Sequence, residues 1–214
     1  PMAVLRTAVS LLSHLCPACE DNSADADMRK SMYLLAQIPT CIGAHQMALD
    51  GKDPVDPDEN LDHAANLLWC MSGEKPHDSA TKVMDVSLIL YAEHDFNAST
   101  FTCRVVASTN GYLHSCVCGG IGSLKGNLHG GANEAAMEML KEIMEAVEGG
   151  STSEEFMQHA FETKKRLMGF GHRVYKNGDH RAGILRGWGL KYVNEANPDA
   201  KKWFDLGDEV QAIM

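Results

Sequence analysis

Three of the ten histidines, His94, His129 and His172, lie where an imidazole could do chemistry. His129 precedes two glycines and a helix-like pattern in the stretch KGNLHGGANEAAMEML. Glycines let a backbone and a ligand approach closely, and a helix N-terminus offers free N–H groups and a positive partial charge. A histidine held there should stay neutral and could donate a hydrogen bond to a developing oxyanion. The alternative is an ordinary loop histidine beside a glycine-rich turn.

The segment GFGHRVYK surrounds His172 with two glycines and two basic residues, Arg173 and Lys176. Basic side chains near an accessible backbone suit an anionic ligand. Arg181 follows in GDHRAG and could hold a carboxylate through two parallel hydrogen bonds. The alternative for this segment is a solvated basic loop.

His94 ends an apolar helical pattern in ILYAEHDFNASTF, where Asn97 can cap the next helix. Three histidines could also form a zinc site. These three, however, are far apart in the sequence and lack the i, i+4 pairing that helical ligands usually show. The pattern therefore favours a site without a metal.

The composition limits the class of protein. Hydrophobic residues make up 44% and charged residues 22%, as in an ordinary globular protein. The formal net charge of −10 argues against a general nucleic-acid binder, and no apolar run approaches the roughly 18 residues of a membrane span. The first residues do not read as a signal peptide. We therefore expect no nucleic-acid or membrane partner and a cytoplasmic location.

The seven cysteines are expected to be reduced thiols that pack as small hydrophobic residues. Cys16 and Cys19, in CPAC, have the spacing of a redox pair, and Cys116 and Cys118, in CVC, lie in an apolar run. Neither pair has a second pair at the spacing of a zinc site.

Helical periodicity dominates the elements that must position these residues. In residues 132–147 the apolar residues recur with helical spacing and the charged residues fall on the opposite face, as in an amphipathic helix. Gly149 and Gly150 end the pattern. The next segment, STSEEFMQHAFETKKRLMG, opens with an N-terminal signature and is predicted to remain helical up to Gly169. No segment shows the sustained one-by-one alternation of apolar and polar residues that is typical of a β-strand. The sequence predicts an all-α fold, with further helices in residues 1–15, 25–37, 60–73, 79–94 and 197–214 and linkers at 50–60, 73–78, 148–153 and 169–181.

Three segments, taken in order, resemble the citrate synthase family: AEHDFNASTFTCRVVAST, IGSLKGNLHGGANEAAMEML and MGFGHRVYKNGDHRA. Each motif is short, but their order, spacing and chemistry agree over nearly the whole chain. The resemblance implies a two-domain, almost all-α homodimer. It also implies condensation of an acyl-CoA thioester with oxaloacetate and hydrolysis of the resulting CoA intermediate. The family needs no metal or other cofactor.

The resemblance also implies roles for individual residues. His129 would hydrogen-bond the thioester oxygen and stabilise the enol or enolate, which is catalysis by a preorganised donor. His172 would polarise the oxaloacetate ketone and supply its proton, His94 would bind oxaloacetate, and Arg181 would hold one of its carboxylates. The CoA-binding residues would be Leu167, Met168, Gly169, Phe170 and Gly171, through their backbone near the adenine, and Lys176, near the phosphates.

The chain departs from the family pattern at His180, where relatives usually have Pro or Ser, and at the residues NL before the motif histidine. Neither change removes a catalytic group. By resemblance, residues 1–128 form part of the large domain with dimer-forming helices, and residues 129–214 form most of the small domain. The catalytic aspartate and further arginines of the family are expected beyond Met214. Since a carbon acid next to a thioester needs a base, the 214 residues alone are expected to be inactive.

The acyl group is left open between acetyl-CoA, which gives citrate, and propionyl-CoA, which gives 2-methylcitrate. The segment YAEHDFNASTF resembles the methylcitrate branch somewhat more. One methylene changes binding by only about 1–3 kcal/mol, so both thioesters are expected to react. The alternative to the enzyme is an inactive fragment or paralogue that binds CoA and oxaloacetate without turnover.

Overall fold

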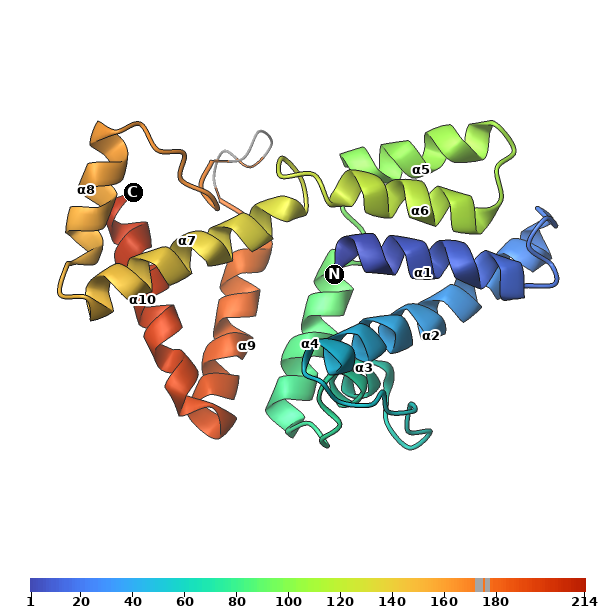
Figure 1. Ribbon diagram of the computed structural model, residues 1–214, viewed down its shortest axis with the longest axis horizontal. Coiled ribbons are helices and arrows are strands. Elements are labelled where there is room, and N and C mark those ends of the chain that lie inside the picture. Colours follow the sequence, from blue (N-terminus) through green and yellow to red (C-terminus); the bar gives the residue numbers. More distant parts are fainter. Residues whose placement is uncertain (172–174, 176–177) are drawn as a thin grey trace. The chain divides into compact units, whose positions relative to one another are not determined.

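The computed structural model describes residues 1–171, 175 and 178–214 and divides the chain into two compact units, residues 1–129 and 130–214. Over these described residues the regular structure is helical, with no strand (Figure 1). The predicted all-α fold is confirmed. Within the same ranges, none of the helices combines the length and hydropathy that a membrane span requires.

A small core cluster joins three of the six helices of the first unit. The helices of this unit are α1 (Met2–Leu15), α2 (Ala24–Leu49), α3 (His63–Ser72), α4 (Asp78–Tyr91), α5 (Ala98–Ser108) and α6 (Leu113–Leu124). Val9 of α1, Leu34 of α2 and Ile121 of α6 are buried against one another. Figure 1 shows α6 lying between α1 and α5. This packing places the start of α5 near the residues that follow α6.

Two glycines let the helices of the first unit approach closely. A Cβ atom on Gly43 of α2 would lie 2.4 Å from Cys70 Cβ and 2.6 Å from the Cys70 carbonyl carbon of α3. A Cβ atom on Gly120 of α6 would lie 2.6 Å from Cys103 Sγ of α5. Both distances are shorter than any normal contact, so the backbones can come this close only where a side chain is absent.

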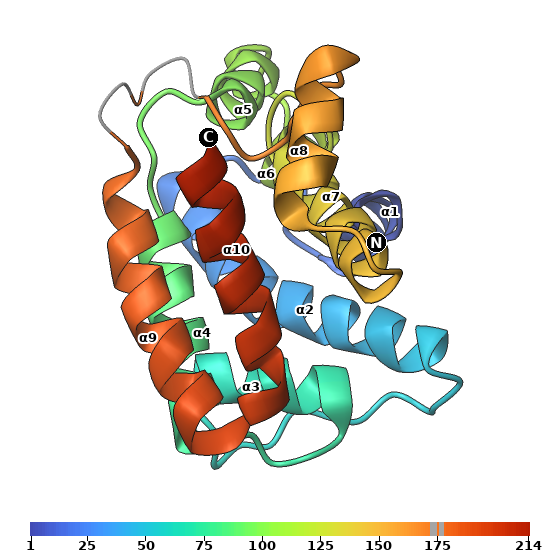
Figure 2. The ribbon, with the colours of Figure 1, turned by 90° about the vertical axis from the view of Figure 1, so that its left-hand side faces the viewer.

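The second unit has its own core. Its elements are α7 (Gly131–Glu148), α8 (Ser153–Glu162), α9 (His180–Ala196), a 3₁₀ turn (Pro198–Ala200) and α10 (Lys201–Ile213), which joins α9 through that turn (Figure 2). The buried core residues come from α7, α8 and α10 and are Met139, Ile143, Met157, Leu206 and Val210.

The helix predicted after His129 is confirmed as α7, with Gly149 at its C-cap. The predicted start of the next helix is also confirmed, because Thr152 and Glu155 form a reciprocal capping box. Its predicted end at Gly169 is wrong, since α8 ends at Glu162 and Lys164 takes a positive φ of 55°. Residues 163–166 are all polar and would bring no apolar side chain to the core in another turn, so burial does not extend the helix.

Candidate functional site

His129 is the last residue of the first unit, and its ring meets the first turn of α5. Its Nε2 atom lies 3.3 Å from the backbone nitrogen of Ser99 and 2.8 Å from Ser99 Oγ. The Ser99 N–H can only donate, so Nε2 must accept. The ring is then neutral with its proton on Nδ1, because the nitrogen opposite an accepting nitrogen carries the hydrogen.

A chain of hydrogen bonds connects His129 to the His94 segment. Ser99 Oγ lies 2.7 Å from Asn97 Oδ1, although its one hydrogen can go either to this oxygen or to His129 Nε2, and Asn97 Nδ2 donates to the His94 carbonyl oxygen at 3.3 Å. Asn97 Oδ1 also accepts the Thr100 N–H at 2.9 Å and caps α5, as the sequence predicted. Two of the predicted site segments are thus brought together in one unit.

The helix terminus that contacts the His129 ring differs from the expected one. The sequence pointed to the helix that follows, and α7 does begin two residues later, at Gly131. The N–H group that reaches the ring belongs to α5. The free N–H groups at the start of a helix can donate to an accepting ring nitrogen, whichever helix supplies them. Ser99 is therefore a partner of the His129 ring that the histidine motifs alone did not indicate.

The segment of residues 167–171 lies on the core of the second unit. The side chains of Leu167 and Phe170 pack against that core. Gly169 and Gly171 have φ angles of 88° and 73°, which side-chain-bearing residues rarely adopt. A Cβ atom on Gly169 would approach Ala136 Cβ to 3.2 Å. The half-buried Met168 lies between these anchors, so packing on both sides holds this backbone in a defined, irregular conformation.

Arg181 lies in the first turn of α9 and donates hydrogen bonds to the carboxylate of the nearby Asp179. Its Nε atom donates to Asp179 Oδ1 at 3.0 Å and its Nη2 atom to Asp179 Oδ2 at 2.7 Å. Asp179 is also the N-cap of α9 and accepts the Arg181 N–H at 2.9 Å. The guanidinium carbon stands 5.9 Å from the centre of the Tyr175 ring. Arg181 therefore makes a bidentate contact with a carboxylate, as the sequence suggested, but the carboxylate is that of Asp179 in the same chain.

The remaining predicted residues, His172 and Lys176, lie outside the described residues. Within the described ranges, no group of three or more His, Cys, Asp and Glu side chains is arranged to hold a metal ion. The predicted site residues that are described belong to both units: His94 and His129 to the first, residues 167–171 and Arg181 to the second.

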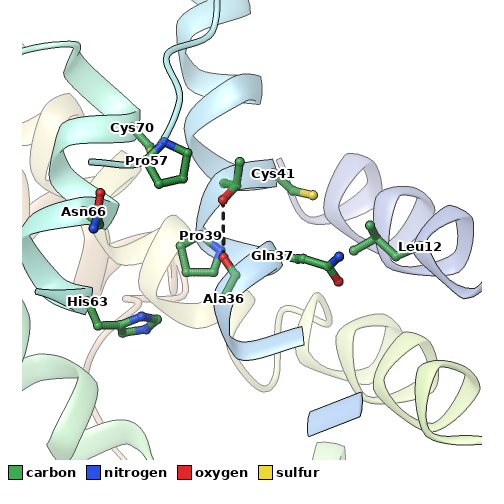
Figure 3. A pocket seen from close by; sticks show the side chains of 10 residues that line it. Leu12, Ala36, Gln37, Pro39, Cys41, Pro57, His63, Asn66 and Cys70 are labelled. Atoms are coloured by element: carbon green, nitrogen blue, oxygen red, sulfur yellow. Dashed lines mark hydrogen bonds between the residues drawn. The ribbon is translucent and has the colours of Figure 1, made fainter. Parts of the chain in front are cut away.

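The first unit also contains a hollow of about 380 Å³, apart from the predicted site residues (Figure 3). It is lined by α1, α2, α3 and the loop before α3: Leu12, Ala36, Gln37, Pro39, Thr40, Cys41, Pro57, His63, Asn66 and Cys70. Pro39 interrupts the hydrogen bonding of α2 beside this hollow. The Asn66 side chain is already used, because it donates to the carbonyls of Asp58 and Leu61.

Known proteins of one family resemble this chain over its whole length. The family model described as citrate synthase, C-terminal domain, matches residues 1–214. "Citrate synthase 2" of Bacillus subtilis is 39% identical over 214 residues, which are 100% of this chain and 56% of that protein. A 2-methylcitrate synthase of Mycobacterium tuberculosis is also 39% identical, over 100% of this chain and 52% of its own length. The chain thus spans about half the length of the curated relatives it matches.

Solved structures show the same fold. Citrate synthase from Pyrobaculum aerophilum aligns with a TM-score of 0.78 and 33% identity, over 100% of this chain and 54% of that one. Citrate synthase from Thermoplasma acidophilum, in a ternary complex with carboxymethyl coenzyme A and oxaloacetate, aligns with a TM-score of 0.83 and 29% identity, over 98% and 54%. With the family match over every residue, these likenesses show that the chain belongs to the citrate synthase family.

Proposed function

We propose that the complete synthase containing this chain condenses an acyl-CoA thioester with oxaloacetate and hydrolyses the CoA intermediate to citrate or 2-methylcitrate. The family match and the relatives of both names support this activity. The observation that carries the proposal is the hydrogen bond from the Ser99 N–H to His129 Nε2. This bond leaves a neutral ring with its Nδ1–H free of the Ser99 contact and available to a substrate oxygen.

The proposed role of His129 follows from this tautomer. When a proton leaves the α-carbon of the thioester, negative charge develops on the thioester oxygen. A neutral Nδ1–H donor stabilises that charge, and the contact with α5 holds the donor in position before the reaction begins. The base that takes the proton is proposed to be the aspartate of the family pattern.

The other residues are proposed to bind substrates. His94 binds oxaloacetate, His172 polarises its ketone and supplies a proton, and Arg181 holds a carboxylate. Arg181 would exchange Asp179 for the substrate carboxylate, a like-for-like replacement of a bidentate partner. The ternary complex of the Thermoplasma acidophilum relative with a CoA analogue and oxaloacetate supports this pair of ligands.

The CoA side is proposed to be the backbone of residues 167–171 with Lys176. The two positive-φ glycines leave this backbone without side chains at Gly169 and Gly171, which permits close approach of a flat ring. We further propose that the first unit supplies large-domain helices and the second most of the small domain. The proposal includes a cytoplasmic homodimer with no cofactor besides the CoA substrate and with no nucleic-acid or membrane partner.

The test is a His129→Ala variant of the complete synthase. We expect kcat to fall by about 10²–10³, because one preorganised donor to the developing oxyanion is lost. The matched control is His159→Ala, which replaces an exposed histidine on α8 and should leave kcat unchanged. CoA release is the measurement. Binding of oxaloacetate and CoA by the unaltered protein without any turnover would contradict the proposal.

The acyl group is tested by comparing kcat/KM for acetyl-CoA and propionyl-CoA on the same protein. A hydrophobic pocket discriminates one methylene by about 10–200-fold, so we expect measurable turnover of both. Complete rejection of one thioester would show a more selective acyl pocket than proposed.

A further inference from the structure

We propose that Cys16 and Cys19 form a dithiol–disulfide site in the turn between α1 and α2, which oxidises on reaction with a small disulfide such as glutathione disulfide. Cys16 is the attacking thiol and Cys19 the resolving one. The observations that carry this inference are the turn that brings the two residues together and the histidine that contacts the second thiol.

The backbone between the two cysteines forms a turn that brings the two residues close together. The Cys19 N–H donates to the Cys16 carbonyl at 3.1 Å, which closes a four-residue turn with Pro17 at its second position. Such turns bring the first and fourth Cα atoms within 7 Å. Disulfides span Cα separations of 4.4–6.8 Å, so the bond can form without unfolding either helix.

The two thiols differ in access. Cys16 is half-buried, whereas Cys19 is 8% exposed. A disulfide from solution therefore meets Cys16 first. Cys19 Sγ lies 3.8 Å from Nδ1 of His114, a side chain that is 2% exposed and sits in the first turn of α6. A neutral His114 can take the proton of Cys19 as its sulfur attacks.

The turn is anchored to the interior by a buried lysine. Lys30 of α2 is 1% exposed, and its Nζ atom donates to the carbonyls of Cys19 at 3.1 Å and Asp21 at 2.6 Å. Asp27 completes this cluster at 2.9 Å from Nζ. Because three partners hold the ammonium, the turn keeps its place while the sulfur atoms change partner.

The reaction balances as two thiol–disulfide exchanges. The Cys16 thiolate attacks one sulfur of the small disulfide and releases one small thiol. The Cys19 sulfur then attacks the Cys16 sulfur of the mixed disulfide and releases the second, while the two protons pass to the released thiols. The cysteine pair is oxidised and the small disulfide is reduced, so no other oxidant is needed.

The position of the pair also favours the disulfide over the dithiol. Cys16 is the C-cap of α1, so the start of that helix lies away from this thiol. In strongly oxidising CxxC sites a helix N-terminus stabilises the reduced form. Without that stabilisation, the disulfide here should resist reduction. A metal role for the same residues is not supported, since no three-ligand cluster exists among the described residues.

The test is peptide mass spectrometry of the complete protein after incubation with glutathione disulfide, acid quenching and alkylation. We expect the peptide with residues 16–19 to lose two hydrogens, to resist alkylation and to become alkylatable after treatment with dithiothreitol. Cys41→Ser, which removes another half-buried thiol, should not change this result. This arm needs no substitution at the site itself.

Two variants test the assigned roles. Cys19→Ala should accumulate glutathione on Cys16, since the resolving thiol is missing, and Cys16→Ser should leave Cys19 unmodified. Two free, alkylated thiols in the native protein would overturn the inference. So would a stable mixed disulfide on its Cys16, or pairing of either residue with a different cysteine.

Discussion

At the scale of single residues, the proposed role of His129 depends on one backbone donor. The Ser99 N–H donates to His129 Nε2, and the Ser99 hydroxyl lies between His129 Nε2 and Asn97 Oδ1, to only one of which it can donate its single hydrogen. The backbone contact decides which nitrogen carries the proton, and the hydroxyl adds to the positioning of the ring.

Ser99→Ala separates these two contributions in the complete synthase. The backbone N–H remains, so the tautomer is kept, while the hydroxyl contact is lost. Since one neutral hydrogen bond contributes about 0.5–1.5 kcal/mol, we expect kcat to fall by about 2- to 10-fold with little change in KM. Ser108→Ala, at the other end of α5, serves as the control. A loss as large as that of His129→Ala would show that the hydroxyl, and not the backbone, holds the ring.

His114 predicts a dependence of stability on pH. Burial, and secondarily the nearby Lys30 charge, lower the pKa of His114 below its ordinary value of 6.5. The unfolded chain therefore binds a proton more readily than the folded one once the pH falls toward and below 6.5. Over that range the titration of His114 should lower the free energy of unfolding by at most about 1.4 kcal/mol per pH unit. Well above pH 6.5 the same group should have no effect on the free energy of unfolding.

Denaturant unfolding at several pH values measures this dependence. His114→Gln should flatten the fall below pH 6.5, because the titrating group is removed. An unchanged slope in a folded His114→Gln protein would assign the dependence to other residues.

At the scale of elements, close contact between helices depends on missing side chains. Gly43→Ala would press a methyl group into the Cys70 backbone, which belongs to a neighbouring helix and cannot turn away. We expect the free energy of unfolding to fall by about 1–3 kcal/mol from overpacking. Gly183→Ala in α9 is the control, since its new methyl group would meet no atom within 4 Å. That change should raise stability by up to about 1 kcal/mol through helix propensity, as measured by denaturant titration.

At the scale of the whole molecule, each unit has a core of its own. Met157→Ala removes a side chain that is fully buried in the second core. We expect the free energy of unfolding of that unit to fall by about 2–5 kcal/mol. Hydrogen exchange should accelerate in residues 130–214 and much less in residues 1–129. Met28 is 65% exposed, so Met28→Ala should change neither the free energy of unfolding nor the hydrogen-exchange rates. Equal acceleration in both units would show that they unfold as one.

The helical class, the starts of α7 and α8 and the Asn97 cap could all be predicted from the amino-acid order, because periodicity and capping depend on residues a few positions apart. The sequence also placed the histidine motifs in the order of the family. The helix α6 was not anticipated, since its glycines disfavour a helix until α5 packs against them. The bond between Ser99 and His129 joins residues 30 positions apart. Only the packing of α5 on α6 decides which donor reaches the ring, and so which nitrogen faces a substrate.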